Sequence, residues 1–329
     1  DVYCVTFKDG RSVRCSGDHL WKVFHKHWSE PKFKILPTQE IATRLDKREK
    51  AYLYVPLCAE VEMVERKLPI HPYLLGALLG DGSFATRGTT LSFASSDFDV
   101  LARIIETLPH GTELRACSSS SRPYNYNIIG GVNGNGRLGM RHPILIALQE
   151  LGLLYRKSSA KFVPDTYKYA SVQQRLELLR GLMDTDGTVD KSGSISFCST
   201  SIQLASDVAD VVHSLGGIAR ITSKIPHYTY RGVKRSGQRA YNVNIRITNG
   251  ERIFSLQRKV DRLPENYQYA DNLRLQIVSV RYTGKEATQC IRVSNPDSLY
   301  LTDSYVVTHN TLSAESLAYA LFDDAKAMT

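Results

Sequence analysis

Two similar stretches, HPYLLGALLGDG at residues 71–82 and LLRGLMDTDG at residues 178–187, decide how this sequence folds. Each is an apolar segment with helical spacing that ends in Asp-Gly. Asp81 and Asp186 are therefore expected at helix carboxyl ends, where a carboxylate opposes the helix dipole at a cost of ~0.3–1 kcal/mol. Two such carboxylates brought together would also repel each other. A divalent cation between them removes both costs, because hard cations prefer carboxylate oxygens.

The matching extends beyond these stretches and indicates an internal repeat. Both copies predict the order helix, strands, helix, strand, helix, and a repeat this long is a duplicated domain rather than a solenoid. We place the copies at about 67–165 and 170–270. The other matched pairs are LSFASS (91–96) with ISFCST (195–200), RPYNYNI (122–128) with RAYNVNI (239–245), and, more weakly, HPILIALQELGLL (142–154) with RIFSLQRKV (252–260).

Small residues follow one face of each of the two helices. Gly76 and Gly80 are spaced i, i+4 in the first copy, and Gly181 and Thr185 hold the same places in the second. Small side chains on one face allow the backbones of two helices to approach closely. The alternative for each Asp-Gly is an ordinary turn after a helix. Because Asp-Gly occurs at equivalent places in both copies, we favour a shared function for the two aspartates.

These helices resemble the signature helices of the LAGLIDADG homing endonucleases, and the resemblance covers roughly residues 67–270. It implies a monomeric nuclease in which an αββαββα unit is duplicated about a pseudo-twofold axis. It also implies that Asp81 and Asp186, with the backbones of Gly80 and Thr185, bind two or more Mg²⁺ ions. Such ions hydrolyse DNA phosphodiester bonds by activating water and neutralising the charge that develops on the phosphate.

The family also supplies a basic residue in each half, which stabilises charge near the scissile phosphate. KFVP (161–164) resembles the family's lysine-then-proline element and suggests Lys161. RKVDRLP (258–264) is the equivalent in the second copy and suggests Lys259. The alternative is that both are solvated lysines on the surface.

Charge and strand pattern both favour double-stranded DNA as the partner. The chain carries 42 Lys and Arg against 33 Asp and Glu, a net charge of +9, and such a surplus favours a polyanion. Alternation along the predicted strands puts basic and aromatic side chains on one face, which would enter the major groove. For any single residue the alternative is an ordinary solvated sheet. The candidate DNA contacts are Arg115, Arg122, Tyr124, Tyr126, Lys224, Arg231, Lys234, Arg235 and Arg239.

The two ends of the chain do not belong to the repeat. Residues 1–23, with a turn at Asp9-Gly10, and residues 276–310 both have the pattern of strands. The fold class we expect is therefore α+β, with an all-β module at 1–66 and 271–310 split by an inserted domain at 67–270. Within it, residues 24–66 contain the basic stretch HKHWSEPKFK and are candidates for further DNA contacts.

SYVVTHNT at 304–311 resembles the C-terminal junction of an intein, whose self-splicing module is the Hint domain. The side-chain amide of Asn310 would attack its own main-chain carbonyl and cut the chain after Asn310. His309 would act as the proton donor or polarising group, because an imidazole can donate or accept a proton near neutral pH. Thr311 would be the downstream hydroxyl nucleophile. SGDH (16–19) resembles the family's T-x-x-H element, which implies that His19 activates the upstream bond.

Two features depart from the intein pattern. The expected N-terminal Cys or Ser nucleophile is missing, since Cys4 and Cys15 lie within the predicted hairpin that leads to His19. We therefore expect a missing or separate N-terminal segment. Ser298 stands where many inteins carry His, which leaves Asp297 as a candidate in its place. Residues 311–329 would be host sequence (C-extein), and TLSAESLAYALF suits the first helix after the phosphate-binding loop of a P-loop ATPase.

The remaining composition excludes several other classes of protein. The six cysteines are scattered and form no C-x-x-C pair, which argues against a zinc knuckle or a disulfide framework. No signal peptide or membrane-spanning run is present, so we expect a cytoplasmic protein with no membrane partner. The rival interpretations are a freestanding LAGLIDADG nuclease or RNA maturase, a DNA-binding protein that has lost its nuclease activity, and a self-processing element with no DNA role.

Overall fold

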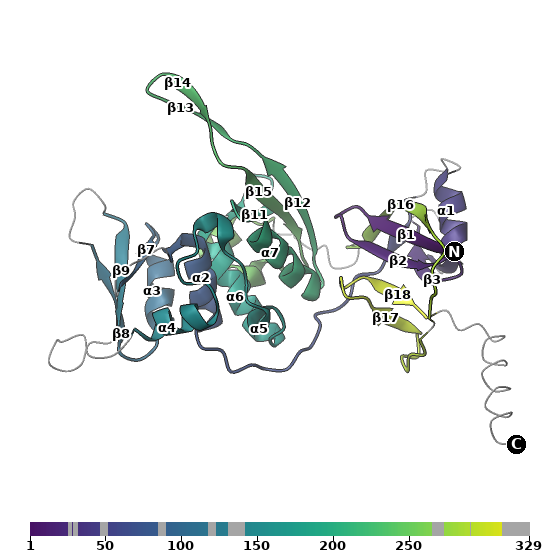
Figure 1. Ribbon diagram of the computed structural model, residues 1–329, viewed down its shortest axis with the longest axis horizontal. Coiled ribbons are helices and arrows are strands. Elements are labelled where there is room, and N and C mark those ends of the chain that lie inside the picture. Colours follow the sequence, from purple (N-terminus) through teal and green to yellow (C-terminus); the bar gives the residue numbers. More distant parts are fainter. Residues whose placement is uncertain are drawn as a thin grey trace, which may run out of the picture. The chain divides into compact units, whose positions relative to one another are not determined.

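The computed structural model describes residues 1–25, 28, 32–46, 52–84, 90–117, 123–130, 142–264, 273–289 and 291–310. The chain divides into a smaller unit, Asp1–Ala59 with Asn272–Thr329, and a larger unit, Glu60–Asp271 (Figure 1). The predictions for Arg122, Thr311 and the host segment 311–329 lie outside the described residues. No described helix is both long and apolar enough to cross a lipid bilayer.

The larger unit has two halves whose elements follow the same order, joined by the short helix α5 (Asp165–Lys168). The first half contains α2 (Pro72–Asp81), β6 (Gly82–Ser83), β7 (Thr90–Ala94), α3 (Phe98–Thr107), β8 (Thr112–Ala116), β9 (Asn125–Gly130), α4 (Pro143–Glu150) and the 3-10 turn η1 (Ser158–Ala160). The second half contains α6 (Val172–Thr185), β10 (Gly187–Val189), β11 (Ile195–Ser199), α7 (Ile202–Ser214), β12 (Ile218–Lys224), β13 (His227–Tyr230), β14 (Val233–Ser236), β15 (Ala240–Arg246), the 3-10 turn η2 (Gly250–Ile253) and α8 (Gln257–Val260).

Each half forms one four-stranded antiparallel sheet, in the order β6-β7-β9-β8 and β10-β11-β15-β12. Alternate side chains of the strands are buried, among them Phe93 on β7, Phe197 on β11 and Val243 on β15, and their neighbours face solvent. The helices α2 and α6 lie side by side between the two sheets in Figure 1. One hydrophobic core therefore connects both halves.

Two features differ from the predicted order. The stretch 252–260 forms the turn η2 and a single helical turn, α8, instead of a longer helix like α4. The carboxylate of Asp184 accepts the N–H groups of Ser255 (3.0 Å) and Leu256 (3.4 Å), which fixes the chain between those two turns. The second half also contains the hairpin β13–β14, which projects from the rest of its unit in Figure 1.

The helices α2 and α6 approach each other as closely as two backbones can. A Cβ atom added to Gly76 would lie 2.2 Å from the carbonyl oxygen of Leu178, and one added to Gly181 would lie 2.1 Å from that of Tyr73. Both distances are far inside van der Waals contact with backbone atoms, so only glycine fits at these two positions. The predicted close packing of small residues is confirmed.

The helix starts have ordinary capping chemistry. Ser171 caps α6 in a capping box with Gln174, and His71 caps α2 by accepting the N–H of Tyr73 (3.3 Å), with Pro72 in the first turn. The carboxyl ends, where Asp81 and Asp186 stand, are less usual.

In the part of the smaller unit that the structure describes, eight strands form one sheet beside one helix, and the strands come from both ends of the chain. Strand β16 pairs with β1, and β18 pairs with β3, so the larger unit is inserted between β5 and β16. Trp21 is fully buried in its core and donates to the hydroxyl of Thr38 (3.0 Å). The elements are β1 (Val2–Phe7), β2 (Ser12–Ser16), β3 (Leu20–Phe24), β4 (Phe33–Pro37), α1 (Thr38–Asp46), β5 (Tyr54–Val55), β16 (Leu275–Gly284), β17 (Leu299–Leu301) and β18 (Val307–His309).

The first boundary of the inserted unit lies at residue 60 rather than 67. The N–H of Val61 donates to the carbonyl oxygen of Ser214 (2.9 Å), and Arg175 donates to that of Val61, so this stretch belongs to the larger unit. Within the predicted insert 24–66, β4 pairs with β3 and Ile41 of α1 is fully buried. That part of the insert is therefore integral to the smaller unit.

Candidate functional site

Asp81 and Asp186 occupy equivalent places at the ends of the two central helices. Asp81 is the last residue of α2, and Asp186 follows α6 as its C-cap. Burial, and next the negative charge of Asp81, raise the pKa of Asp186 to about 6. Burial also raises the pKa of Asp81, against the lowering effect of Lys161. The two carboxylates therefore share one electrostatic environment that disfavours both negative charges.

The two predicted lysines lie beside these helix ends and are buried, with 2% of Lys161 and 5% of Lys259 exposed. The ammonium of Lys161 donates to the carbonyl oxygens of Leu79 and Gly82, both at 2.8 Å. The ammonium of Lys259 makes the equivalent contacts with Asp184 (2.8 Å) and Gly187 (2.7 Å). The alternative of solvated surface lysines is therefore wrong.

Each lysine compensates for the charge at the end of a helix in its own half. A cation at a helix carboxyl end is favourable, and here it satisfies carbonyl groups that have no partner within the helix. Burial lowers the pKa of Lys161 to about 8, opposed by Asp186 and Asp81. Burial also lowers the pKa of Lys259 to about 8, opposed first by Asp184. The carboxylates and the ammonium groups thus interact without forming a direct ion pair among the described residues.

The donor set at this site fits a divalent oxygen-ligated cation. Asp81 and Asp186 offer carboxylate oxygens, and the carbonyl oxygen of Gly80 lies 3.2 Å from the ammonium of Lys161 and keeps a further lone pair. The hydroxyl of Thr185 donates back to Gly181 (2.9 Å), so only its main-chain carbonyl would serve as a ligand. Among the described residues no group of three or more His, Cys, Asp or Glu side chains comes together. Water and substrate oxygens would therefore complete any coordination sphere.

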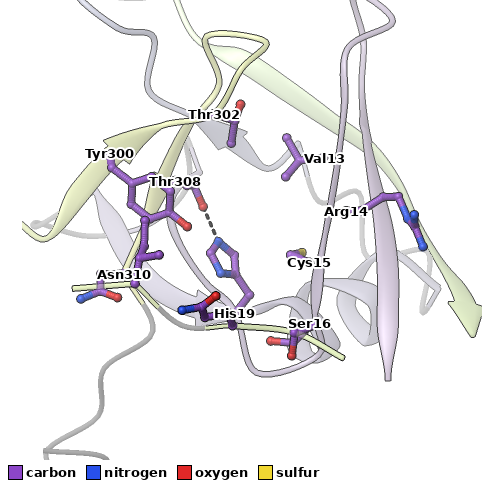
Figure 2. Close-up of a pocket in the computed structure, with 12 residues that line it drawn as sticks. Val13, Arg14, Cys15, Ser16, His19, Tyr300, Thr302, Thr308 and Asn310 are labelled. Carbon is purple, nitrogen blue, oxygen red and sulfur yellow. Dashed lines mark hydrogen bonds between the residues drawn. The ribbon is translucent and has the colours of Figure 1, made fainter. Parts of the chain in front are cut away.

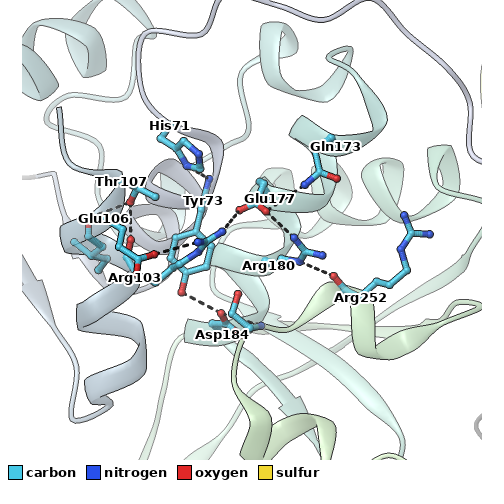
Figure 3. A network of polar contacts seen from close by, with 12 residues as sticks. His71, Tyr73, Arg103, Glu106, Thr107, Gln173, Glu177, Arg180, Asp184 and Arg252 are labelled. Carbon is cyan, nitrogen blue, oxygen red and sulfur yellow. Dashed lines mark hydrogen bonds and ion pairs between the residues drawn. The ribbon is translucent and has the colours of Figure 1, made fainter.

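Asp184, which has no acidic counterpart in the first half, has a different role. It is buried, accepts the hydroxyl of Tyr73 (3.0 Å) and binds the backbone of Ser255, so its oxygens are already engaged (Figure 3). A wider network surrounds it: Glu177 pairs with Arg103 of the first half and with Arg180 of its own helix. This network ties the lysine-bearing segment of the second half to α6.

A row of polar side chains crosses the solvent face of each sheet, starting two residues after the aspartate. The rows are equivalent in register, because Ser92 pairs with Asn127 and Asn127 with Arg115, as Ser196 pairs with Asn244 and Asn244 with Arg220. They carry the amide and guanidinium groups that read base edges in the major groove. The two rows are Ser83, Ser92, Asn127 and Arg115, and Thr188, Ser196, Asn244 and Arg220.

Of these eight residues, the sequence pattern predicts only Arg115 as a DNA contact. The signal was present in the matched segments, since Asn127 and Asn244 fall at the same place in YNYNI and YNVNI. Tyr126, which is also predicted to contact DNA, is only partly exposed. Its side chain packs against the hydrophobic core, because Tyr126 pairs with buried Phe93 and so lies on the inner face of its sheet.

The other predicted DNA contacts among the described residues are exposed, and several gather in the projecting hairpin. From Lys224 to Arg239 the chain has five basic residues and no acidic one. The guanidinium groups of Arg231 and Arg235 lie 5.4 and 5.2 Å from the ring centre of Tyr230. This stacking holds the cations on a strand pair whose residues are all exposed. Lys234 lies on the same hairpin and Tyr124 just before β9.

Two of the predicted junction residues, His19 and Asn310, line a cavity of about 260 Å³ in the smaller unit (Figure 2). The ring of His19 on the chain before β3 is hydrogen-bonded to the hydroxyl of Thr308 on β18. Burial, and then the charge of His309, lower the pKa of His19 to about 4, so His19 is neutral at physiological pH. Asn310 is buried at the edge of the same cavity.

The main chain of Asn310 makes two hydrogen bonds within the smaller unit. Nδ1 of His309 lies 2.6 Å from the main-chain oxygen of Asn310, and since a carbonyl only accepts, the ring donates. The N–H of Asn310 donates to the carbonyl oxygen of Ser298 (2.7 Å). Ser298 therefore contributes through its backbone, whereas Asp297 is exposed. Burial raises the pKa of Cys15 to about 11, so that thiol stays protonated.

Comparison with known proteins places a LAGLIDADG-like domain at residues 173–261, which lie in the second half of the larger unit. Over 255 residues the chain is 31% identical to the replicative DNA helicase DnaB of Mycobacterium intracellulare. That match covers 76% of this chain, and the chain spans 37% of the length of the helicase.

Three solved structures share a weaker likeness. Mesophilic variants of the homing endonuclease I-DmoI are 15% identical, over 59% of this chain and 92% of theirs, with a TM-score of 0.32. I-DmoI in complex with DNA and Mn is 14% identical, over 56% of this chain and 92% of its own, with a TM-score of 0.34. The N-terminal LAGLIDADG domain of DUF199/WhiA is 11% identical, over 59% of this chain and 86% of its own, with a TM-score of 0.31.

The raised pKa of Asp186 predicts how stability depends on pH in metal-free protein. Because the folded pKa (about 6) exceeds the ordinary value of 3.8, the ionised side chain destabilises the fold increasingly as pH rises from about 4 to 6. We expect Asp186→Asn to be more stable than wild type above pH 6, by about 1–3 kcal/mol, and equal to it near pH 4.

Urea unfolding in a chelator, followed by circular dichroism, measures this difference; both tryptophans lie in the smaller unit and would not report it. Mg²⁺ should stabilise the wild type and remove the difference in unfolding free energy between it and Asp186→Asn. Asp99→Asn, at an exposed position on α3, is the matched control. Equal stability of Asp186→Asn and wild type at pH 7.5 would contradict the assigned electrostatics.

Proposed function

We propose that the larger unit is a site-specific endonuclease that hydrolyses both strands of a DNA duplex with the help of divalent metal ions. The observation that carries this proposal is the pair of partly buried carboxylates, Asp81 and Asp186, at equivalent helix ends beside two buried lysines. When bound, Mg²⁺ supplies activation of water and neutralisation of charge on the phosphate. The net reaction adds water across one phosphorus–oxygen bond in each strand, leaving a phosphate on one fragment and a hydroxyl on the other.

The residues of the chain then have distinct roles. Asp81 and Asp186, with the carbonyls of Gly80 and Thr185, would hold the metal ions. Lys161 and Lys259 keep positive charge close to both carboxylates, and we assign them to stabilising the charge that develops on the scissile phosphates.

DNA recognition is assigned to the solvent faces of the two sheets. An arginine pairs well with guanine and an asparagine with adenine in the major groove. Arg115 with Asn127, and Arg220 with Asn244, would therefore read base pairs at equal distances from the centre of the target. Lys224, Arg239 and the hairpin would add phosphate contacts on one side only.

The nuclease proposal predicts Mg²⁺-dependent double-strand cleavage of specific sites in a plasmid library. Asp81→Asn and Asp186→Asn should each lower the rate at least about 100-fold, because even outer-shell partners of a metal are worth 10–100-fold. Both variants should keep their affinity for DNA, and Asp99→Asn should cut like wild type. Wild-type protein that binds a site and leaves it uncut would show that nuclease activity has been lost.

We propose further that the smaller unit is a protein-splicing module of the intein type, interrupted by the nuclease. The specific observation in favour is the hydrogen bond from His309 to the carbonyl of Asn310, which polarises the carbon that the side-chain amide would attack. In this reaction the amide nitrogen of Asn310 bonds to that carbon, and the peptide bond to Thr311 breaks. The departing nitrogen takes up a proton, and a succinimide remains.

The likeness to a replicative helicase suggests the host. A splicing element within a helicase gene would leave host sequence after Asn310, and residues 311–329 would be that sequence. The target of the nuclease would be the uninterrupted host gene.

Intact mass spectrometry after incubation at neutral pH tests the splicing proposal. We expect the wild type to lose the mass of residues 311–329 and Asn310→Ala to keep it. His309→Ala should slow the loss about 10–100-fold, since it removes the polarising donor. An unchanged wild-type mass would favour a freestanding nuclease or RNA maturase.

A further inference from the structure

The two lysines of the larger unit are held by contacts that cross between its halves. The segment that carries Lys161 belongs to the first half, yet helix α7 of the second half binds it. The hydroxyl of Ser201 donates to the carbonyl oxygen of Lys161 (2.6 Å), and the N–H of Val163 donates to Asp207 (2.8 Å). Ser201 and Asp207 are each 1% exposed, so water does not compete for these hydrogen bonds.

The second lysine segment shows the reverse arrangement. Arg258, the residue before Lys259, pairs with Asp97 of the first half, with Nε 2.9 Å from Oδ2. Tyr73 of the first half also donates to Asp184, which in turn binds the backbone of the same segment at Ser255 (Figure 3). Each lysine therefore caps the central helix of its own half, while the other half holds its segment, through the backbone around Lys161 and through the Arg258 side chain beside Lys259.

Asp97 and Ser201 are equivalent residues, since they are the N-caps of α3 and α7. Ser201 caps its helix by accepting the N–H of Leu204 (3.1 Å) as well as binding Lys161. Aspartate is a favoured N-cap, but the side chain of Asp97 makes no capping hydrogen bond and pairs with Arg258 instead. The same position is thus used in both halves, with different chemistry, to hold the opposite lysine segment.

We propose that Asp97 and Ser201 are positioning residues that couple the two half-sites, each holding the lysine that serves cleavage of one DNA strand. This inference rests on the proposed nuclease function. Loss of one contact displaces one lysine and leaves the other in place. The reciprocal arrangement keeps the rates of cleavage of the two DNA strands equal.

The test compares the cleavage rate of each strand in a duplex labelled on either strand. Asp97→Asn removes the ion pair with Arg258, and Ser201→Ala removes the bond to the carbonyl of Lys161. We expect each variant to slow one strand about tenfold relative to the other, the two variants to affect opposite strands, and nicked plasmid to accumulate. Lys259→Met and Lys161→Met identify the strand that depends on each lysine, and the bias of Asp97→Asn should match that of Lys259→Met.

Two matched controls remove similar interactions elsewhere. Glu106→Gln breaks an ion pair with Arg103 on α3, and Ser171→Ala removes the cap of α6. Neither residue touches a lysine segment, so neither variant should produce a strand bias. Equal slowing of both strands in Asp97→Asn and Ser201→Ala, or no slowing, would overturn the inference.

Hydrogen–deuterium exchange gives a readout that does not need cleavage. Ser201→Ala should speed exchange at residues 161–163, and Asp97→Asn should speed it at residues 255–260, in each case in the half opposite the substitution. A wild type that cuts no DNA but shows this reciprocal pattern would refute the nuclease proposal and support the positioning contacts. A wild type that cuts, with no reciprocal pattern, would refute the positioning contacts alone.

Discussion

The larger unit depends on the direct contact between the backbones of α2 and α6 at Gly76 and Gly181. Because no side chain separates the helices there, their carboxyl ends converge and bring Asp81 and Asp186 into one electrostatic environment. The same contact places the two sheets on either side of the helix pair. The proposed metal centre and the proposed two-part DNA surface thus both depend on one packing constraint, and a larger residue at either glycine would separate the ends as well as the helices.

Convergence of two helix ends concentrates negative charge, from the carboxylates and from both helix dipoles. The buried ammonium groups of Lys161 and Lys259 offset the dipoles by binding the terminal carbonyls, and they leave the carboxylate oxygens available. Their burial makes both lysines sensitive to small shifts of the surrounding backbone. That sensitivity explains why so many contacts, some from the opposite half, hold the two short segments that carry them.

Much of this arrangement was predictable from local sequence, because the repeat is explicit. The two Asp-Gly motifs, the small-residue faces and both lysine elements are short patterns whose spacing has a physical meaning. The burial of the lysines was not predictable. A lysine before a proline is normally expected on the surface, and only the structure shows which helix end it caps. Tyr126 and Asn127 show that the inward or outward direction of a strand residue is also hard to predict from sequence. Which of two neighbours faces the core depends on strand register, and the pattern YNYNI fits either choice.

The cross-strand rows and the cavity around His19 could not be predicted from the sequence, because each brings together residues that are distant in the chain. Arg220 becomes recognisable only when its pairing with Asn244 mirrors that of Arg115 with Asn127. Thr308 becomes recognisable only when β18 brings it to His19.

The measurement that tests the central claim most directly is Mn²⁺ binding to metal-free protein, followed by the electron paramagnetic resonance signal of the free ion. If the converging carboxylates form one metal centre, wild type binds Mn²⁺, and Asp81→Asn and Asp186→Asn each weaken that binding at least about tenfold. Unchanged affinity in both variants would contradict the account, because the metal would then be bound somewhere other than the ends of α2 and α6.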